Sequence, residues 1–136
     1  HRLFEGTLDR YPGLKICAAH GGGYVASYAG RFDQGCPTRP DLCPGGTHGP
    51  IQKAPSEYLK GLYYDTMVFG EPQLEHLVNL WGAGHVVIGT DYPYDMGYYK
   101  PVDFVERAKR LTRAQKDAII GGNAAKILGL KPRRKR

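Results

Sequence analysis

Short apolar runs alternate with longer segments of mixed apolar and polar positions along this chain. The apolar runs at 14–19, 62–66 and 86–90 predict three strands. The mixed segments predict helices at about 24–33, 55–60, 71–81, 102–111 and 112–128, after a helix that ends near residue 10. Alternation of this kind predicts an α/β fold with a parallel sheet and right-handed crossovers.

Local signals set the limits of several of these elements. Leu74, Leu77, Val78 and Trp81 fall at i, i+3, i+4 and i+7, which predicts one apolar helix face. Thr112 and Gln115 fit a capping box that begins the last helix. Gly121 and Gly122 predict an interruption of that helix. Residues 35–55 are rich in proline and glycine and predict a long loop.

The length of 136 residues suits one domain and is too short for the roughly 250 residues of a complete (β/α)8 barrel. With 41% hydrophobic and 24% charged residues, the composition is that of a folded globular chain rather than a disordered one. The sequence has no run of about 20 apolar residues, so we expect no membrane-spanning helix. We also expect no secretory leader.

The net charge of +6 is concentrated at the end of the chain. Five of these charges belong to the tail at 131–136, so the body carries about +1. A nearly neutral body does not predict a nucleic-acid surface. We expect a solvated tail, and a polyanion contact or localisation signal is the alternative.

The chain has three cysteines, Cys17, Cys36 and Cys43. An odd number without a leader predicts a reducing, cytoplasmic location and no disulfide framework. Cys36, Cys43 and His48 could alternatively bind zinc, although their spacing fits no common structural site.

Two polar residues stand directly at the ends of predicted strands. His20 follows the first strand and Asp91 follows the third. Because chemistry in parallel α/β sheets gathers at the carboxyl ends of the strands, the two could converge on one substrate or ion. A hydrogen-bonded structural histidine and a turn aspartate are the alternatives. Gly21 to Gly23 would let the backbone approach a ligand closely.

Several motifs of the chain resemble one enzyme family. They are, in order, Ala18 to Gly23 (AAHGGG), Gly30-Arg31, Arg39 to Cys43 (RPDLC), Tyr64 to Thr66 (YDT), Gly89 to Tyr94 (GTDYPY) and Gly122 to Leu130 (GNAAKILGL). Together they resemble the C-terminal part of the amidohydrolase-related metal-dependent decarboxylases. The resemblance implies a distorted (β/α)8 TIM-like barrel of the metal-dependent hydrolase superfamily, with the three strands here as its sixth, seventh and eighth.

The resemblance also implies roles for single residues. Asp91 matches a metal-binding aspartate, usually on zinc, and His20 matches a general base beside the metal-bound water. Arg31 matches an arginine that reaches into a neighbouring subunit's site and holds a substrate carboxylate, so a homodimer is implied. Tyr94 matches an aromatic pocket residue. These assignments agree with the affinity of arginine for carboxylates and with the proton chemistry of imidazole.

The family's other metal ligands have no match, because the sequence contains no His-x-His and no His-Pro. Catalytic zinc usually takes three protein ligands. We therefore expect residues 1–130 to be the last part of a barrel and residues 131–136 to be a tail. The expected parent is a zinc-dependent carbon–carbon lyase acting on a small unsaturated or aromatic carboxylate. A hydrolase or hydratase of the same superfamily, or an inactive fragment that only associates with partners, is the alternative.

Overall fold

A computed structural model describes residues 5–43 and 51–131 of the chain. His48 and the tail after Lys131 lie outside these described residues, so the expectations for them are untested. The chain divides into two compact units. Unit 1 covers residues up to Ile16 together with Tyr24–Leu62, and unit 2 covers Cys17–Gly23 together with the chain from Tyr63 onward. The expected domain boundary near residue 130 stays a prediction.

Unit 2 contains the parallel sheet that the sequence predicts. Strands β1 (Cys17–Ala18), β2 (Tyr63–Asp65) and β3 (Val86–Val87) follow in the order β1-β2-β3, and both pairings are parallel. Tyr64 on β2 is paired with Ala18 on one side and with Val86 on the other. Because both pairings are parallel, the carboxyl ends of all three strands lie at one edge.

The strands are shorter than the apolar runs that predict them. A strand extends only as far as its ladder hydrogen bonds, and β1 pairs on one side only among the described residues. Leu14 is 47% exposed and Cys17 is also exposed. This run therefore departs from the burial on both faces that is typical of parallel strands. Val86 and Val87, on the third strand, are both buried.

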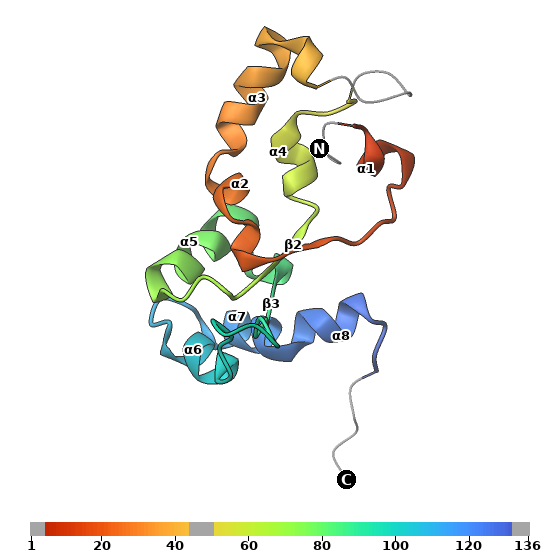
Figure 1. Ribbon diagram of the computed structural model, residues 1–136. Helices are drawn as coiled ribbons and strands as arrows, with labels where there is room; N and C mark the ends of the chain where they lie inside the picture. Colours follow the sequence, from red (N-terminus) through yellow and green to blue (C-terminus); the bar gives the residue numbers. More distant parts are fainter. Residues whose placement is uncertain (1–4, 44–50, 132–136) are drawn as a thin grey trace. The chain divides into compact units, whose positions relative to one another are not determined.

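The helices of unit 2 pack on this sheet or on one another. They are α5 (Glu71–Trp81), α6 (Pro101–Arg107), α7 (Arg113–Asp117) and α8 (Asn123–Ile127), with a π-helical segment at Ala118–Gly122 and a 3-10 turn at Ala83–His85. The predicted apolar face of α5 is buried, and the Tyr64 ring stacks on Trp81 with centroids 5.7 Å apart. The α5 helix, the π-helical segment and α8 all contact β3 (Figure 1).

The last helical stretch differs from its prediction in one respect. Thr112 forms the expected capping box with Gln115. Gly121 and Gly122 do not break the helix, because they lie in a π-helical segment that joins α7 to α8. The buried Asn123 side chain donates from Nδ2 to the carbonyls of Ala83 and Val86, each at 2.7 Å. This contact ties α8 to the start of β3.

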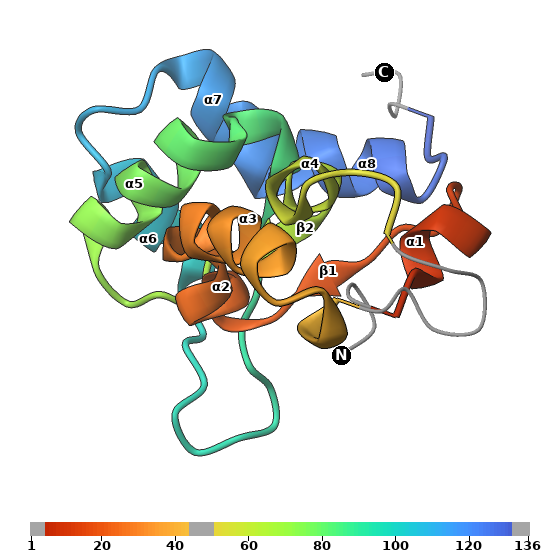
Figure 2. The ribbon, with the colours of Figure 1, turned by 90° about the horizontal axis from the view of Figure 1, so that it is seen from above.

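Unit 1 consists of short helices: α1 (Thr7–Arg10), α2 (Tyr24–Ser27), α3 (Ala29–Thr38), a 3-10 turn at Pro40–Leu42 and α4 (Pro55–Leu59). The α3 helix packs against α4, and Asp33 accepts a hydrogen bond from the Ser56 N–H at 2.8 Å (Figure 2). Tyr58 on α4 donates to Asp9 on α1 at 2.6 Å. These polar contacts connect segments far apart in the sequence.

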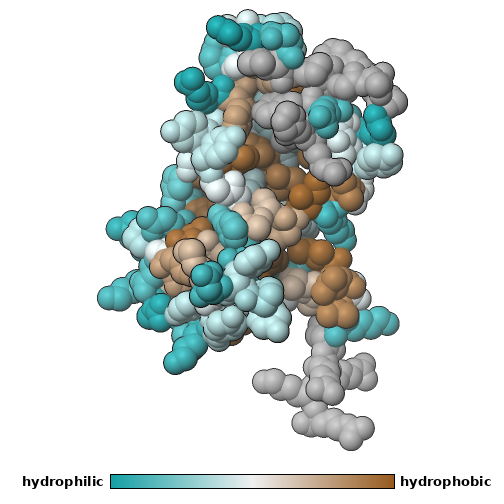
Figure 3. Space-filling model, in the orientation of Figure 1, coloured by the Kyte–Doolittle hydropathy of each residue, from teal (hydrophilic) through white to brown (hydrophobic). Residues whose placement is uncertain are grey.

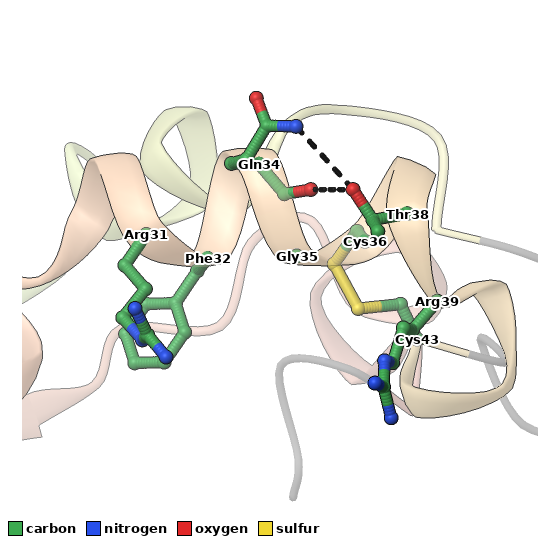
Figure 4. Close-up of a pocket in the computed structure, with 8 residues that line it drawn as sticks. All are labelled: Arg31, Phe32, Gln34, Gly35, Cys36, Thr38, Arg39 and Cys43. Atoms are coloured by element: carbon green, nitrogen blue, oxygen red, sulfur yellow. Dashed lines mark hydrogen bonds between the residues drawn. A yellow bond between two sulfur atoms is a disulfide. The ribbon is translucent and has the colours of Figure 1, made fainter.

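Two expectations for residues 35–43 are corrected by the structure. The helix continues through Pro37 to Thr38, whose hydroxyl donates to the Gln34 carbonyl, so the loop begins later than predicted. Cys36 and Cys43 are joined in a disulfide (Figure 4). Their thiolates are therefore not available as zinc ligands, and the argument from cysteine number against disulfides is wrong for this pair.

The surface carries hydrophobic side chains at the α8 end of unit 2 (Figure 3). Leu128 and Leu130, just beyond that helix, are 68% and 62% exposed. Within the described ranges, no helix is both long and apolar enough to cross a membrane.

Candidate active site

The turn that follows β1 brings His20 to the carboxyl edge of the sheet. His20 has φ 56°, in the left-handed region, and the next three glycines also have positive φ. A Cβ at Gly21 would lie 2.4 Å from Cγ1 of Val68, and one at Gly22 would lie 2.8 Å from the Tyr64 ring. These two glycines thus allow the turn to approach the protein's own side chains. We expect from the sequence that these glycines let the backbone approach a ligand. In the structure they let it approach Val68 and Tyr64.

Asp91 occupies an equivalent place after β3. Residues 88–90 continue from the strand, and Asp91 then adopts φ 56°. The Tyr94 N–H donates to the Asp91 carbonyl at 2.9 Å and closes a turn that contains the cis Tyr92–Pro93 peptide. Asp91 is therefore a turn residue, as the structural alternative predicts, and it also carries a carboxylate at the sheet edge.

The structure brings the His20 and Asp91 side chains together. His20 Nε2 lies 3.3 Å from Asp91 Oδ1, a distance at which a protonated Nε2 donates to the carboxylate. The His20 side chain is 62% exposed, whereas that of Asp91 is 22% exposed. The imidazole is thus open to a reactant and the carboxylate beside it is largely enclosed. Such a pair can orient an imidazole for proton transfer.

The end of β2 connects the two turns, a feature that sequence reasoning missed. Asp65 Oδ1 accepts hydrogen bonds from the N–H groups of Gly21, at 2.9 Å, and Met67, at 3.0 Å. The buried Thr66 accepts from the Gly89 N–H at 3.1 Å. The Tyr-Asp-Thr motif places these polar residues at the carboxyl end of the middle strand, but it does not indicate which N–H groups they accept from.

Tyr94 and Arg31 are the other predicted site residues. Tyr94 lies in the turn after Asp91 and is 67% exposed. Arg31 lies on α3 in unit 1 and is exposed. Its side chain lines an open cavity of about 730 Å³ together with Phe32, Arg39 and the Cys36–Cys43 disulfide (Figure 4). Asp33, two residues further along α3, accepts a hydrogen bond from the Ser56 N–H.

A metal centre needs more ligands than this edge provides. In the part of the chain that the structure describes, no three His, Cys, Asp or Glu side chains gather where they could hold an ion. His20 and Asp91 are two groups, whereas catalytic zinc usually has three protein ligands. The described residues therefore do not form a complete metal site.

A parallel sheet with helices packed on it, and polar residues converging at its carboxyl edge, defines a segment of an α/β fold whose site lies at the ends of its strands. A sequence profile described as amidohydrolase matches residues 1–130. The chain belongs to the amidohydrolase family.

Two relatives extend this assignment. The 2-amino-3-carboxymuconate-6-semialdehyde decarboxylase of Dictyostelium discoideum is 41% identical over 130 residues, which are 96% of this chain and 35% of the relative. The crystal structure of 5-carboxyvanillate decarboxylase from Sphingomonas paucimobilis is 27% identical with a TM-score of 0.81, covering 96% of this chain and 38% of that one. This chain thus spans little more than a third of either relative. Its three parallel strands and helices are part of the TIM-like barrel of the superfamily.

A further solved structure shares the fold. The 5-carboxyvanillate decarboxylase of Novosphingobium aromaticivorans, crystallised with manganese and 4-hydroxy-3-methoxy-5-nitrobenzoic acid, is 24% identical with a TM-score of 0.77. It covers 95% of this chain and 37% of that one. Manganese, rather than the zinc that our expectation names, is the metal in that structure.

Proposed function

We propose that this chain is a C-terminal barrel segment of a non-oxidative decarboxylase that acts on a small aromatic or unsaturated carboxylate. The observation that carries the proposal is the His20–Asp91 pair at the carboxyl edge of the sheet. Its support from similarity is that the relatives described above carry decarboxylase names.

In this proposal His20 transfers the proton. Loss of carbon dioxide leaves an electron pair on the substrate carbon, and that carbon must receive a proton. An exposed imidazole at the sheet edge can supply or relay it, and Asp91 orients the ring through the 3.3 Å contact. General acid–base catalysis of this kind typically contributes about 10² to 10⁴ in rate.

Arg31 and Tyr94 are assigned to substrate binding. The Arg31 guanidinium would grip a carboxylate with two parallel hydrogen bonds. We propose that it serves the site of a second subunit, so that the active protein is a homodimer. The exposed Tyr94 ring, beside Asp91 in sequence, would contact the substrate's ring or unsaturated chain.

We also propose Asp91 as one ligand of a divalent metal. The resemblance described above implies that this metal is zinc. The remaining ligands would come from outside the described residues, since these do not complete a site. We assign no chemical step to the ion. Metal analysis of the purified parent protein distinguishes zinc from manganese.

The test is an assay for released carbon dioxide on a panel of hydroxylated aromatic and unsaturated carboxylates, with the full-length protein that carries this chain. Carbon dioxide formed in proportion to product supports the proposal. Hydrolysis or hydration without carbon dioxide would instead establish the alternative reaction of the same superfamily. Absence of any turnover, with metal present in stoichiometric amount, would contradict both.

A further inference from the structure

The backbones of His20 and Asp91 are both held in an unfavourable conformation. Each has φ 56°, whereas residues with a Cβ seldom adopt the left-handed region. Such conformations persist where the surrounding structure fixes them. Contacts around the two turns should therefore determine where these side chains lie.

Asp65 fixes the turn that carries His20. Its Oδ1 accepts from the Gly21 N–H at 2.9 Å, and this N–H belongs to the peptide that joins His20 to Gly21. The same oxygen accepts from the Met67 N–H at 3.0 Å, which orients the carboxylate. Hydrogen bonds to an ionised acceptor are roughly twice as strong as neutral ones.

Thr66, the next residue, fixes the segment that carries Asp91. Its side chain is 2% exposed, and Oγ1 accepts from the Gly89 N–H at 3.1 Å, two residues before Asp91. The Asp65 side chain also packs on Gly89, where an added Cβ would lie 2.9 Å from the Asp65 Cβ. Asp65, the last residue of β2, and Thr66, the residue directly after it, thus contact the segments on both sides.

We propose that Asp65 and Thr66 are positioning residues that set the distance between the His20 imidazole and the Asp91 carboxylate. They act through the backbone of the two turns and do not touch the substrate. The expected effect on kcat rests on the proposed function. The distance from His20 Nε2 to Asp91 Oδ1 can be measured without any reaction.

The first test compares Asp65→Ala with Asp65→Asn in the full-length protein that carries this chain. The alanine removes the acceptor of both N–H groups, whereas the asparagine keeps Oδ1 in place. We expect Asp65→Ala to lower kcat by about 10- to 100-fold with KM changed less than about twofold, because a misplacement of about 1 Å can cost 10²-fold. Asp65→Asn should recover most of kcat. Asp103→Asn, an exposed carboxylate on α6, is the matched control and should match wild type.

A second pair covers the case in which Asp65→Ala does not fold. Thr66→Val removes the hydroxyl that accepts from Gly89, and Thr66→Ser keeps it. We expect the valine variant to lower kcat by about 10-fold and the serine variant to restore it, with melting temperatures used to confirm that each is folded.

Crystal structures of the variants give a readout that does not depend on turnover. In Asp65→Ala or Thr66→Val, the His20 Nε2 to Asp91 Oδ1 distance should exceed 3.5 Å. An unchanged distance with unchanged kcat in both would overturn the proposal. So would an Asp65→Asn variant as defective as the alanine at an unchanged distance, because the charge itself would then be required. A wild-type protein that releases no carbon dioxide would refute the proposed function, while the distances would still test the positioning.

Discussion

His20 Nε2 lies 3.3 Å from Asp91 Oδ1, although 71 residues separate the two positions in the chain. The contact forms because β1 and β3 flank β2 in a parallel sheet, so that the residues after both strands reach the same edge. A turn with left-handed backbone then directs each side chain toward the other.

Replacing each member of this pair should have a different consequence in the parent protein. Since asparagine tolerates the left-handed region, His20→Asn should remain folded, lose at least about 10²-fold in kcat and keep its metal. Asp91→Asn should also lose metal, because an ionised ligand is removed. Turnover and bound metal would be measured on the same samples. His76→Asn, exposed on α5, is the control, and metal loss in His20→Asn would contradict the assigned roles.

Arg31→Ala tests the proposed homodimer. The variant should lose turnover, and mixing it with His20→Asn should restore part of it, because one hybrid site then holds both intact residues. Arg110→Ala, whose side chain is 86% exposed, should stay active. Absence of recovery, once subunit exchange is confirmed by mass spectrometry, would show that Arg31 serves no partner site.

Reduction of the Cys36–Cys43 disulfide should loosen the end of α3. The bond spans seven positions, and loop-closure entropy for so short a ring corresponds to about 2–3 kcal/mol. We expect faster amide exchange over residues 36–43 after reduction, with exchange in α5 unchanged. Thiol titration of the untreated protein should find one free cysteine, Cys17, and a Cys17→Ser variant should show none. Three reactive thiols before reduction would contradict the bond.

Two buried tyrosines should resist alkaline titration. Burial raises the pKa of Tyr64, and burial followed by its hydrogen bond to Asp9 raises the pKa of Tyr58. The folded state thus holds these protons more tightly, so the stabilisation is complete below the ordinary pKa of about 10 and is lost as pH rises through the folded values. Absorbance of the phenolate should show both groups titrating late. In Tyr64→Phe the loss of stability above pH 10 should be smaller than in wild type.

Asn123→Ala should destabilise unit 2, because it leaves the carbonyls of Ala83 and Val86 without their amide donor. We expect the free energy of unfolding to fall by about 1–3 kcal/mol, measured by denaturant titration. The free energy of unfolding of Asn123→Asp should fall by at least as much, since a carboxylate cannot donate a hydrogen bond. Asn79→Ala, exposed on α5, should change stability by less than about 0.5 kcal/mol and serves as control.

The sequence allowed prediction of the three parallel strands, the α5 face and the capping box, because each depends on local periodicity or on neighbouring residues. It also placed His20 and Asp91 at one edge, since strand ends in a parallel sheet share an edge. The anchoring by Asp65 and Thr66 was not predictable, because it depends on which N–H groups face β2 from other segments. The Cys36–Cys43 bond depends likewise on how α3 ends, and the proline- and glycine-rich composition of residues 35–55 predicts an earlier end.

The left-handed backbone at His20 and Asp91 sets the catalytic role that we propose for them against the stability of the fold. Glycine would relieve the conformation at either position and asparagine would tolerate it, yet neither has the imidazole or the carboxylate. In a library selected only for thermal resistance, both positions should accumulate glycine and asparagine. Such a selection would yield proteins of higher thermal stability that lack the proposed activity. Retention of histidine and aspartate at these positions would then indicate selection for turnover.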